Sequence, residues 1–194
     1  MKVAGGKAVY GAEIGILMLE AQFPRIPGDM GNAGTWPFPV RFKVVRGASP
    51  DRVVRQGAPG LLDAFVEAGH ELVAEGCEGI TTNCGFLSVF QAELSTALSV
   101  PVATSSLMQF PMILAMLPPG RPVGVLTISE ASMTAEHLAK AGVPPDTLIW
   151  GTDGGAEFSR VILDDERELD IALARADMIA AAEAFQDAHP ELGA

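Results

Sequence analysis

The sequence has few of the residues on which several protein classes depend. Its 194 residues include two cysteines and three histidines, and neither a CxxC nor an HExxH motif is present. Two cysteines do not build the disulfide framework of a small secreted protein, and the usual ligand spacing of a zinc site is missing. No apolar run reaches the roughly 18 residues of a membrane span. The longest, residues 107–117, is interrupted by Gln109 and Pro111.

Basic residues are also scarce. There are 13 of them against 24 acidic residues, which gives a formal net charge of −11 and a pI near 4.6. A nucleic-acid-binding protein normally carries a basic patch, and a basic patch is not evident here. Gly5, Gly6 and Lys7 interrupt any signal-peptide core. We therefore expect a cytoplasmic protein whose partner is a small molecule, with no nucleic acid and no membrane involved.

What the sequence does contain is an alternation of short apolar runs and helical patterns. Hydrophobic residues make up 48% of the chain. Continuous apolar runs predict buried strands over residues 13–20 and 122–128. Further strands are predicted over residues 40–45, 79–82, 101–104 and 147–150, with Arg41 and Lys43 on the solvent face of the strand at 40–45. Apolar residues at helical spacing predict helices over residues 61–76, 87–98, 106–117, 132–141 and 168–188. Strands that alternate with helices predict an α/β fold with parallel sheets.

A faint internal repeat divides the chain. The run that begins at Gly15 matches the run that begins at Gly124, 109 positions later. It predicts two similar α/β units, residues 1–118 and residues 119–194, with a boundary at the Pro-Pro-Gly of residues 118–120. The second unit has fewer predicted strands than the first, so we expect it to be incomplete.

The strongest local signal for chemistry is the end of the strand at residues 79–82. Asn83, Cys84 and Gly85 follow it, just before the next predicted helix. Ligands of open α/β sheets bind beyond the carboxyl ends of the strands, and a helix start offers free N–H groups. Asn83 can donate a hydrogen bond and Gly85 allows close approach of a ligand. We therefore predict that Cys84 is a reactive thiol, whereas Cys77 is an inert, buried one.

Hydroxyl groups follow two other predicted strands. Ser105 follows one, and Thr127 and Ser129 follow another, where they either bind an anion together or cap helices. Ser132 is predicted to cap the helix that ends at residue 141. The histidines carry no predicted role, and residues 164–166 are interpreted as a solvent-exposed helix start.

A long proline- and glycine-rich loop over residues 22–39 follows the first strand. Loops of this length are often functional. We expect residues 22–32 to cover the pocket, with Arg25 binding a second substrate carboxylate or forming a structural salt bridge.

Three segments together resemble the aspartate/glutamate racemase superfamily. They are residues 15–32 (GILMLEAQFPRIPGDMGN), the Gly79–Phe86 strand with its Asn-Cys-Gly, and Pro101–Ser106. The superfamily includes amino-acid and hydantoin racemases, an arylmalonate decarboxylase and maleate isomerase. The resemblance implies two α/β units with the active site between them, no cofactor, and a homodimer or higher oligomer.

Racemases of that family use two cysteines, one from each unit, on opposite faces of the substrate α-carbon. The resemblance implies that Cys84 is one of them, with a pKa tuned toward neutrality, and that Asn83, Gly85, Thr127 and Ser129 stabilise the developing carbanion. The sequence departs from the pattern, because it reads Asn-Cys-Gly where glutamate racemases read Cys-Asn-Thr.

Three functions follow from this resemblance. The first is a racemase of a small amino acid or related carboxylate. The second is a single-cysteine enzyme, either a malonate-type decarboxylase or a maleate-type cis–trans isomerase. The third is a carboxylate-binding protein without catalysis. Because the repeat places the counterpart of Cys84 near residue 193, we expect the natural protein to extend beyond Ala194 and to carry a second cysteine there.

Overall fold

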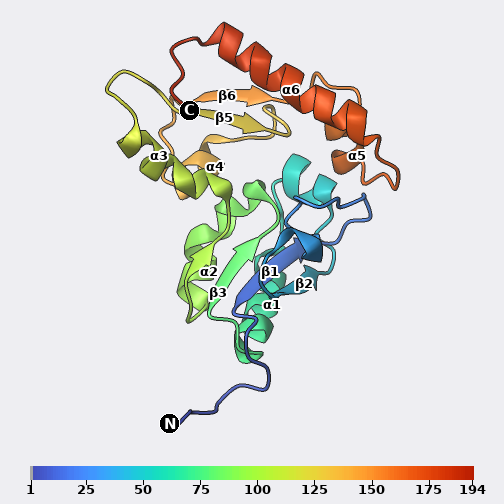
Figure 1. Cartoon of the computed structure of the whole chain (residues 1–194), viewed down its shortest axis with the longest axis vertical. Coiled ribbons are helices and arrows are strands. Elements are labelled where there is room, and N and C mark those ends of the chain that lie inside the picture. Colours follow the sequence, from blue (N-terminus) through green and yellow to red (C-terminus); the bar gives the residue numbers. More distant parts are fainter. Residues whose placement is uncertain (1) are drawn as a thin grey trace.

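The computed structural model describes residues 2–194 and contains two parallel sheets. The carboxyl ends of the strands in the first sheet point toward the second sheet (Figure 1). The first sheet has four parallel strands in the order β2-β1-β3-β4. Their bounds are β1 Ile14–Leu19, β2 Val40–Val45, β3 Gly79–Thr82 and β4 Val102–Ala103. The last five residues of β1 are buried, because this strand has a neighbour on each side and helices against it.

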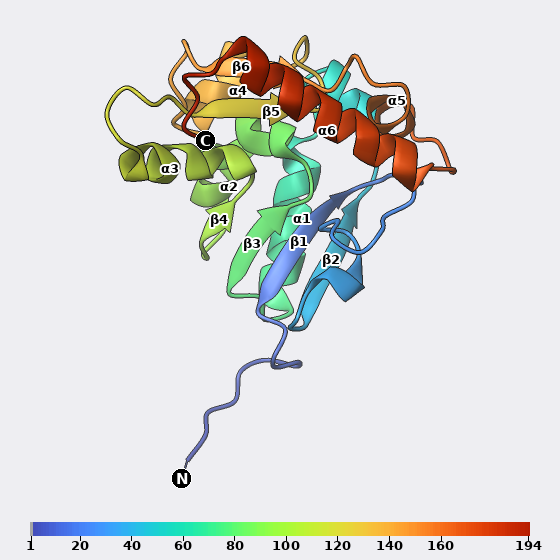
Figure 2. The same ribbon diagram turned by 45° about the horizontal axis from the view of Figure 1, so that its top comes forward.

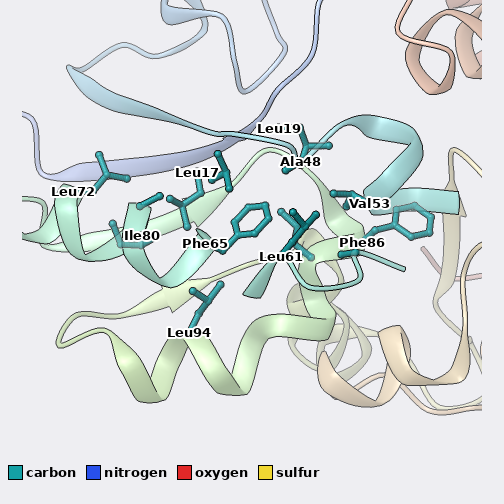
Figure 3. Packing of buried hydrophobic residues seen from close by; sticks show 14 of the residues in the cluster. Leu17, Leu19, Ala48, Val53, Leu61, Phe65, Leu72, Ile80, Phe86 and Leu94 are labelled. Atoms are coloured by element: carbon teal, nitrogen blue, oxygen red, sulfur yellow. The ribbon is translucent and has the colours of Figure 1, made fainter. Parts of the chain in front are cut away.

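Helices of the first unit cover this sheet. They are α1 Leu62–Ala74 and the 3₁₀ turn η3 Gly85–Phe90, which continues into α2 Gln91–Ala97. Gly15 lets α1 approach β1 closely, since a Cβ at this position would lie 2.9 Å from Leu72 Cδ1. Phe65 of α1 is fully buried in the resulting core (Figure 3). Burial of a side chain of this kind contributes about 1.5–3 kcal/mol.

The second sheet has two parallel strands, β5 Gly124–Thr127 and β6 Leu148–Gly151. The elements around it are η4 Ser106–Gln109, α3 Phe110–Met116, α4 Ala135–Lys140, α5 Phe158–Leu163 and α6 Ile171–Ala188. The long α6 lies across the outer side of this sheet (Figure 2). Its Phe185 stacks on Trp150 at 5.6 Å and fits against Gly124, where a Cβ would come within 2.6 Å of the ring.

The last residues of the chain lie beside β5. Gly193 N donates to Pro122 O at 2.8 Å, and Gly124 N donates to Ala194 O at 2.8 Å. Backbone groups of alternate residues point to opposite edges of a strand, and Thr127 O accepts from Thr152 N after β6. Residues 193–194 therefore lie on the edge of β5 away from β6, as β3 lies on the edge of β1 away from β2.

The predicted α/β fold with parallel sheets is confirmed, and several local predictions are wrong. Ser132 does not cap α4, which begins after Thr134 in a capping box completed by His137. The last helix begins at Ile171 rather than near residue 168. The short π-helical turn η2 at Asp51–Arg55 and helix α5 were not predicted. Both are too short to show a clear helical period in the sequence. Among residues 2–194, no helix has the length and apolar character needed to span a bilayer.

Candidate active site

A cavity of about 450 Å³ lies where the carboxyl ends of β1 and β3 meet the second sheet. The first unit contributes Arg25, Asn83 and Cys84, and β5 contributes Thr127. Most of the remaining wall is apolar and includes four phenylalanines, Phe23, Phe86, Phe110 and Phe158. In Figure 1, β1 and β3 point upward toward β5, so the cavity occupies the position expected for ligands of parallel sheets.

Cys84 lies at the bend between β3 and η3. Its backbone is extended, with φ −138° and ψ 118°, and its N–H donates to Thr82 Oγ1 at 3.3 Å. The Thr82 hydroxyl donates in turn to Thr104 O at 2.6 Å, which ties the end of β3 to the segment after β4. These bonds hold the thiol at the cavity wall.

The electrostatic environment of Cys84 differs from the expectation. Burial raises the pKa of the thiol from its ordinary 9.0 to about 11, and this effect outweighs the backbone N–H groups of Phe86 and Leu87 and the charge of Arg25, which all lower it. The prediction of a pKa tuned toward neutrality is therefore wrong. Sequence reasoning identified the helix start and missed the apolar wall that opposes it.

Asn83 joins two strands at the same place. Its Oδ1 accepts a hydrogen bond from Leu19 N at 2.8 Å, so the side chain is held against the end of β1. The amide NH₂ is then the polar group that remains for a ligand. Gly85 also lines the cavity. A Cβ added at this position would lie 3.4 Å from Ser105 Oγ, which is an ordinary contact distance.

Arg25 comes from the loop after β1, and its side chain is only 15% exposed. Its Nη1 donates to Asp29 Oδ1 at 2.9 Å, and its guanidinium lies 4.4 Å from the centre of the Phe23 ring. Its Nη2 is buried and has no hydrogen-bond partner. A buried donor without an acceptor costs free energy, and a carboxylate in the cavity would remove that cost. The structural salt bridge expected as one role of Arg25 is present, with Asp29.

The predicted hydroxyl residues are separated by the fold. Thr127 lines the cavity. Ser105 instead caps η4, because its hydroxyl oxygen accepts a hydrogen bond from Leu107 N. Ser129 is buried, and its hydroxyl donates to Ser132 Oγ at 3.0 Å. The anion site expected from Ser105, Thr127 and Ser129 together is not formed.

Two parts of the site were not foreseen. Phe110 and Phe158 reach the cavity from α3 and α5, and isolated phenylalanines carry no sequence signal for such a role. His137 is buried against Phe86, with ring centres 5.1 Å apart, and its backbone carbonyl accepts from Ser88 Oγ. The second unit therefore supports the turn that follows Cys84.

The thiol pKa leads to a first testable prediction, on alkylation by iodoacetamide. Only the thiolate reacts, so labelling of Cys84 is expected to be slow at pH 7 and to rise about tenfold per pH unit toward pH 11. The raised pKa also means that Cys84 contributes stability below pH 9 that is lost as the pH rises through 11. Peptide mapping by mass spectrometry gives the labelled residue at each pH.

Cys77 is the internal control for this experiment. It is 2% exposed, and burial raises its pKa as well. We expect it to stay unlabelled in the folded protein, with Cys84→Ser removing the labelling altogether. Faster labelling of Cys77 than of Cys84 would contradict the assignment of the site.

Comparisons with known proteins give two kinds of similarity. No family model matches the chain. The chain is 28% identical over 167 residues to dimethylsulfoniopropionate lyase 6 of Emiliania huxleyi, which covers 82% of this chain and 44% of that protein. It is 28% identical over 129 residues to a dimethylsulfoniopropionate lyase of Durusdinium, covering 65% and 42%. The chain thus spans less than half the length of the curated relatives it matches.

The structural comparison identifies the fold. An aspartate racemase homologue from Pyrococcus horikoshii superposes with a TM-score of 0.51 at 14% identity, over 91% of this chain and 80% of that one. The chain therefore has the aspartate racemase fold, as the resemblance in the sequence implied.

Proposed function

We propose that this chain forms the proton-transfer site of a cofactor-independent lyase that acts on a small carboxylate. The observation that carries the proposal is one cavity lined by both Cys84 and Arg25, whose buried Nη2 has no hydrogen-bond partner. Four curated relatives with significant similarity are dimethylsulfoniopropionate lyases, which supports a lyase over other uses of this fold.

The residues of the cavity suit removal of a proton next to a carboxylate. Arg25 Nη2 and the Asn83 amide bind the carboxylate, which places its α-carbon toward Cys84. A thiol of raised pKa becomes a strong base once ionised, and the α-proton of a carboxylate needs a strong base. The donors that bind the carboxylate also stabilise the negative charge that develops on it.

Dimethylsulfoniopropionate is the substrate that we propose to test first. The Cys84 thiolate takes one α-proton, and the C–H electron pair forms the double bond between the α- and β-carbons. The bond from the β-carbon to sulfur breaks, and its electron pair stays on sulfur. The products are dimethyl sulfide and acrylate, and the thiol returns its proton to solvent.

The cavity wall suits a cationic sulfonium group with apolar substituents, which leaves as neutral dimethyl sulfide. The wall includes four phenylalanine side chains, and the faces of aromatic rings attract cations. Asp29 is the acidic residue of the wall, and its carboxylate already accepts hydrogen bonds from Arg25 Nη1 and Gly31 N. A sulfonium group is therefore held by aromatic and apolar contacts rather than by an ion pair.

Racemisation by Cys84 is the second candidate, favoured by the aspartate racemase fold. It needs a proton donor on the opposite face of the α-carbon. Within residues 2–194, the polar side chain that β5 brings to the cavity is Thr127, and a threonine hydroxyl is a much weaker acid than a thiol. Elimination requires one base only, so the described residues suit it better.

One experiment separates these functions. The full chain is incubated in D₂O with dimethylsulfoniopropionate and, in parallel, with L-aspartate, maleate and an arylmalonate. Dimethyl sulfide and acrylate in equal amounts support the lyase. Deuterium at the α-carbon with inversion assigns a racemase, fumarate an isomerase, and CO₂ release a decarboxylase. Binding without any turnover overturns the proposal and assigns a carboxylate-binding protein.

A further inference from the structure

The loop that carries Arg25 is attached to the second unit at its first residues. Asp165, just after α5, accepts two backbone hydrogen bonds at its Oδ1, from Gln22 N at 2.6 Å and from Phe23 N at 3.1 Å. These donors lie more than 140 positions away in the sequence. Arg167 adds a hydrogen bond to the side chain of Gln22.

The backbone of Asp165 is unusual. Its φ is +55°, and Glu166 N donates to Val161 O at 2.9 Å, which closes the end of α5 as in a Schellman motif. The residue at this position is usually glycine, because a Cβ disfavours positive φ. Aspartate at this position costs free energy because of its positive φ, but it contributes a carboxylate, which glycine lacks.

The contacts continue from Asp165 into the cavity. Its carboxylate holds the backbone of Phe23, and the Phe23 ring lies 4.4 Å from the guanidinium carbon of Arg25. The same loop is closed on itself by the Arg25–Asp29 pair and by Asn32 Nδ2, which donates to Arg25 O at 2.7 Å. A second bridge, from Arg55 to Asp164 at 2.8 Å, lies beside the attachment point.

We propose that Asp165 is a positioning residue of the site: it fixes the loop that holds the Arg25 side chain at the cavity wall. The inference rests on the proposed carboxylate-binding role of Arg25. It assigns a function to the connection between α5 and α6, which the sequence pattern had presented as a solvent-exposed helix start. That earlier interpretation is wrong, since residues 164–166 follow a helix and Asp165 contacts the first unit.

The test measures how strongly ligand binding depends on the negative charge of the ligand. Propionate and its neutral analogue propionamide are compared by their ability to protect Cys84 from iodoacetamide. Asp165→Gly keeps the positive φ without strain, so it should fold, and it removes both hydrogen bonds. We expect the preference for propionate over propionamide to fall about tenfold, which corresponds to roughly one lost hydrogen bond. Asp165→Asn retains an acceptor oxygen and tolerates the same φ, so it should preserve the preference.

The outcomes distinguish this inference from the proposed function. If Asp165→Gly weakens protection by both ligands equally, or leaves both unchanged, Asp165 is only a turn residue and the inference is overturned. Arg25→Gln, measured in parallel, tests the premise. If it also leaves the preference unchanged, the carboxylate-binding role itself is wrong.

Discussion

Replacement of Cys84 by serine is expected to lower kcat for the α-proton transfer by a thousandfold or more. The thiolate is the base in the proposed reaction, and a serine hydroxyl ionises too weakly to replace it near neutral pH. Positioned general bases contribute on the order of 10²–10⁴ in rate. The measurement is formation of dimethyl sulfide and, independently of the leaving group, exchange of the substrate α-protons in D₂O.

Cys77→Ser is the matched control for this variant. Cys77 lies just before β3, at the opposite end of the strand from Cys84, and its sulfur contacts the backbone carbonyl of Ala12 at 3.9 Å. We expect its activity to stay within a few-fold of the wild type. Residual turnover in Cys84→Ser at the wild-type rate would assign the base to another group.

The pH dependence gives a second readout of the same thiol. Because its pKa is about 11, the thiolate fraction rises tenfold per pH unit up to that value. The rate of the wild type should therefore rise with pH across the neutral range. A rate that is flat with pH between 7 and 9 would show that bound substrate lowers the thiol pKa or that another residue is the base.

Replacement of Arg25 by glutamine is expected to raise KM for a carboxylate substrate by about 10- to 100-fold. A hydrogen bond to a charged group contributes about 1.5–3 kcal/mol. In the proposed function the unpaired Nη2 supplies that bond, whereas Nη1 is already paired with Asp29. Because the same donor also stabilises the charge that develops on the carboxylate, kcat should fall as well.

Two controls separate binding from structure for Arg25. Arg46→Gln changes a surface guanidinium, 86% exposed and paired with Glu20, and should leave KM unchanged. Binding of propionamide, which lacks a charge, should also be unaffected by Arg25→Gln. Equal losses for propionate and propionamide would mean that Arg25 holds the loop in place and does not bind the carboxylate.

The sequence alone was enough to predict the class of fold. The run Ile14–Leu19 is apolar without alternation, as expected for a strand buried on both faces, and its last five residues are buried. Cys84 was found for a related reason: a polar Asn-Cys-Gly directly after such a strand marks its carboxyl end. These signals are local, because consecutive residues are enough to predict where a strand is buried and where it ends.

Tertiary structure decided which residues meet at the site and how they behave. The hydroxyls of Ser105 and Ser129 look equivalent to that of Thr127 in the sequence, but each finds a nearby partner in the folded chain. The high pKa of Cys84 depends on apolar side chains that come from both units. The contact of Asp165 with Phe23 spans 142 positions. Burial and long-range hydrogen bonds depend on distances in space, which a residue's neighbours in the sequence do not determine.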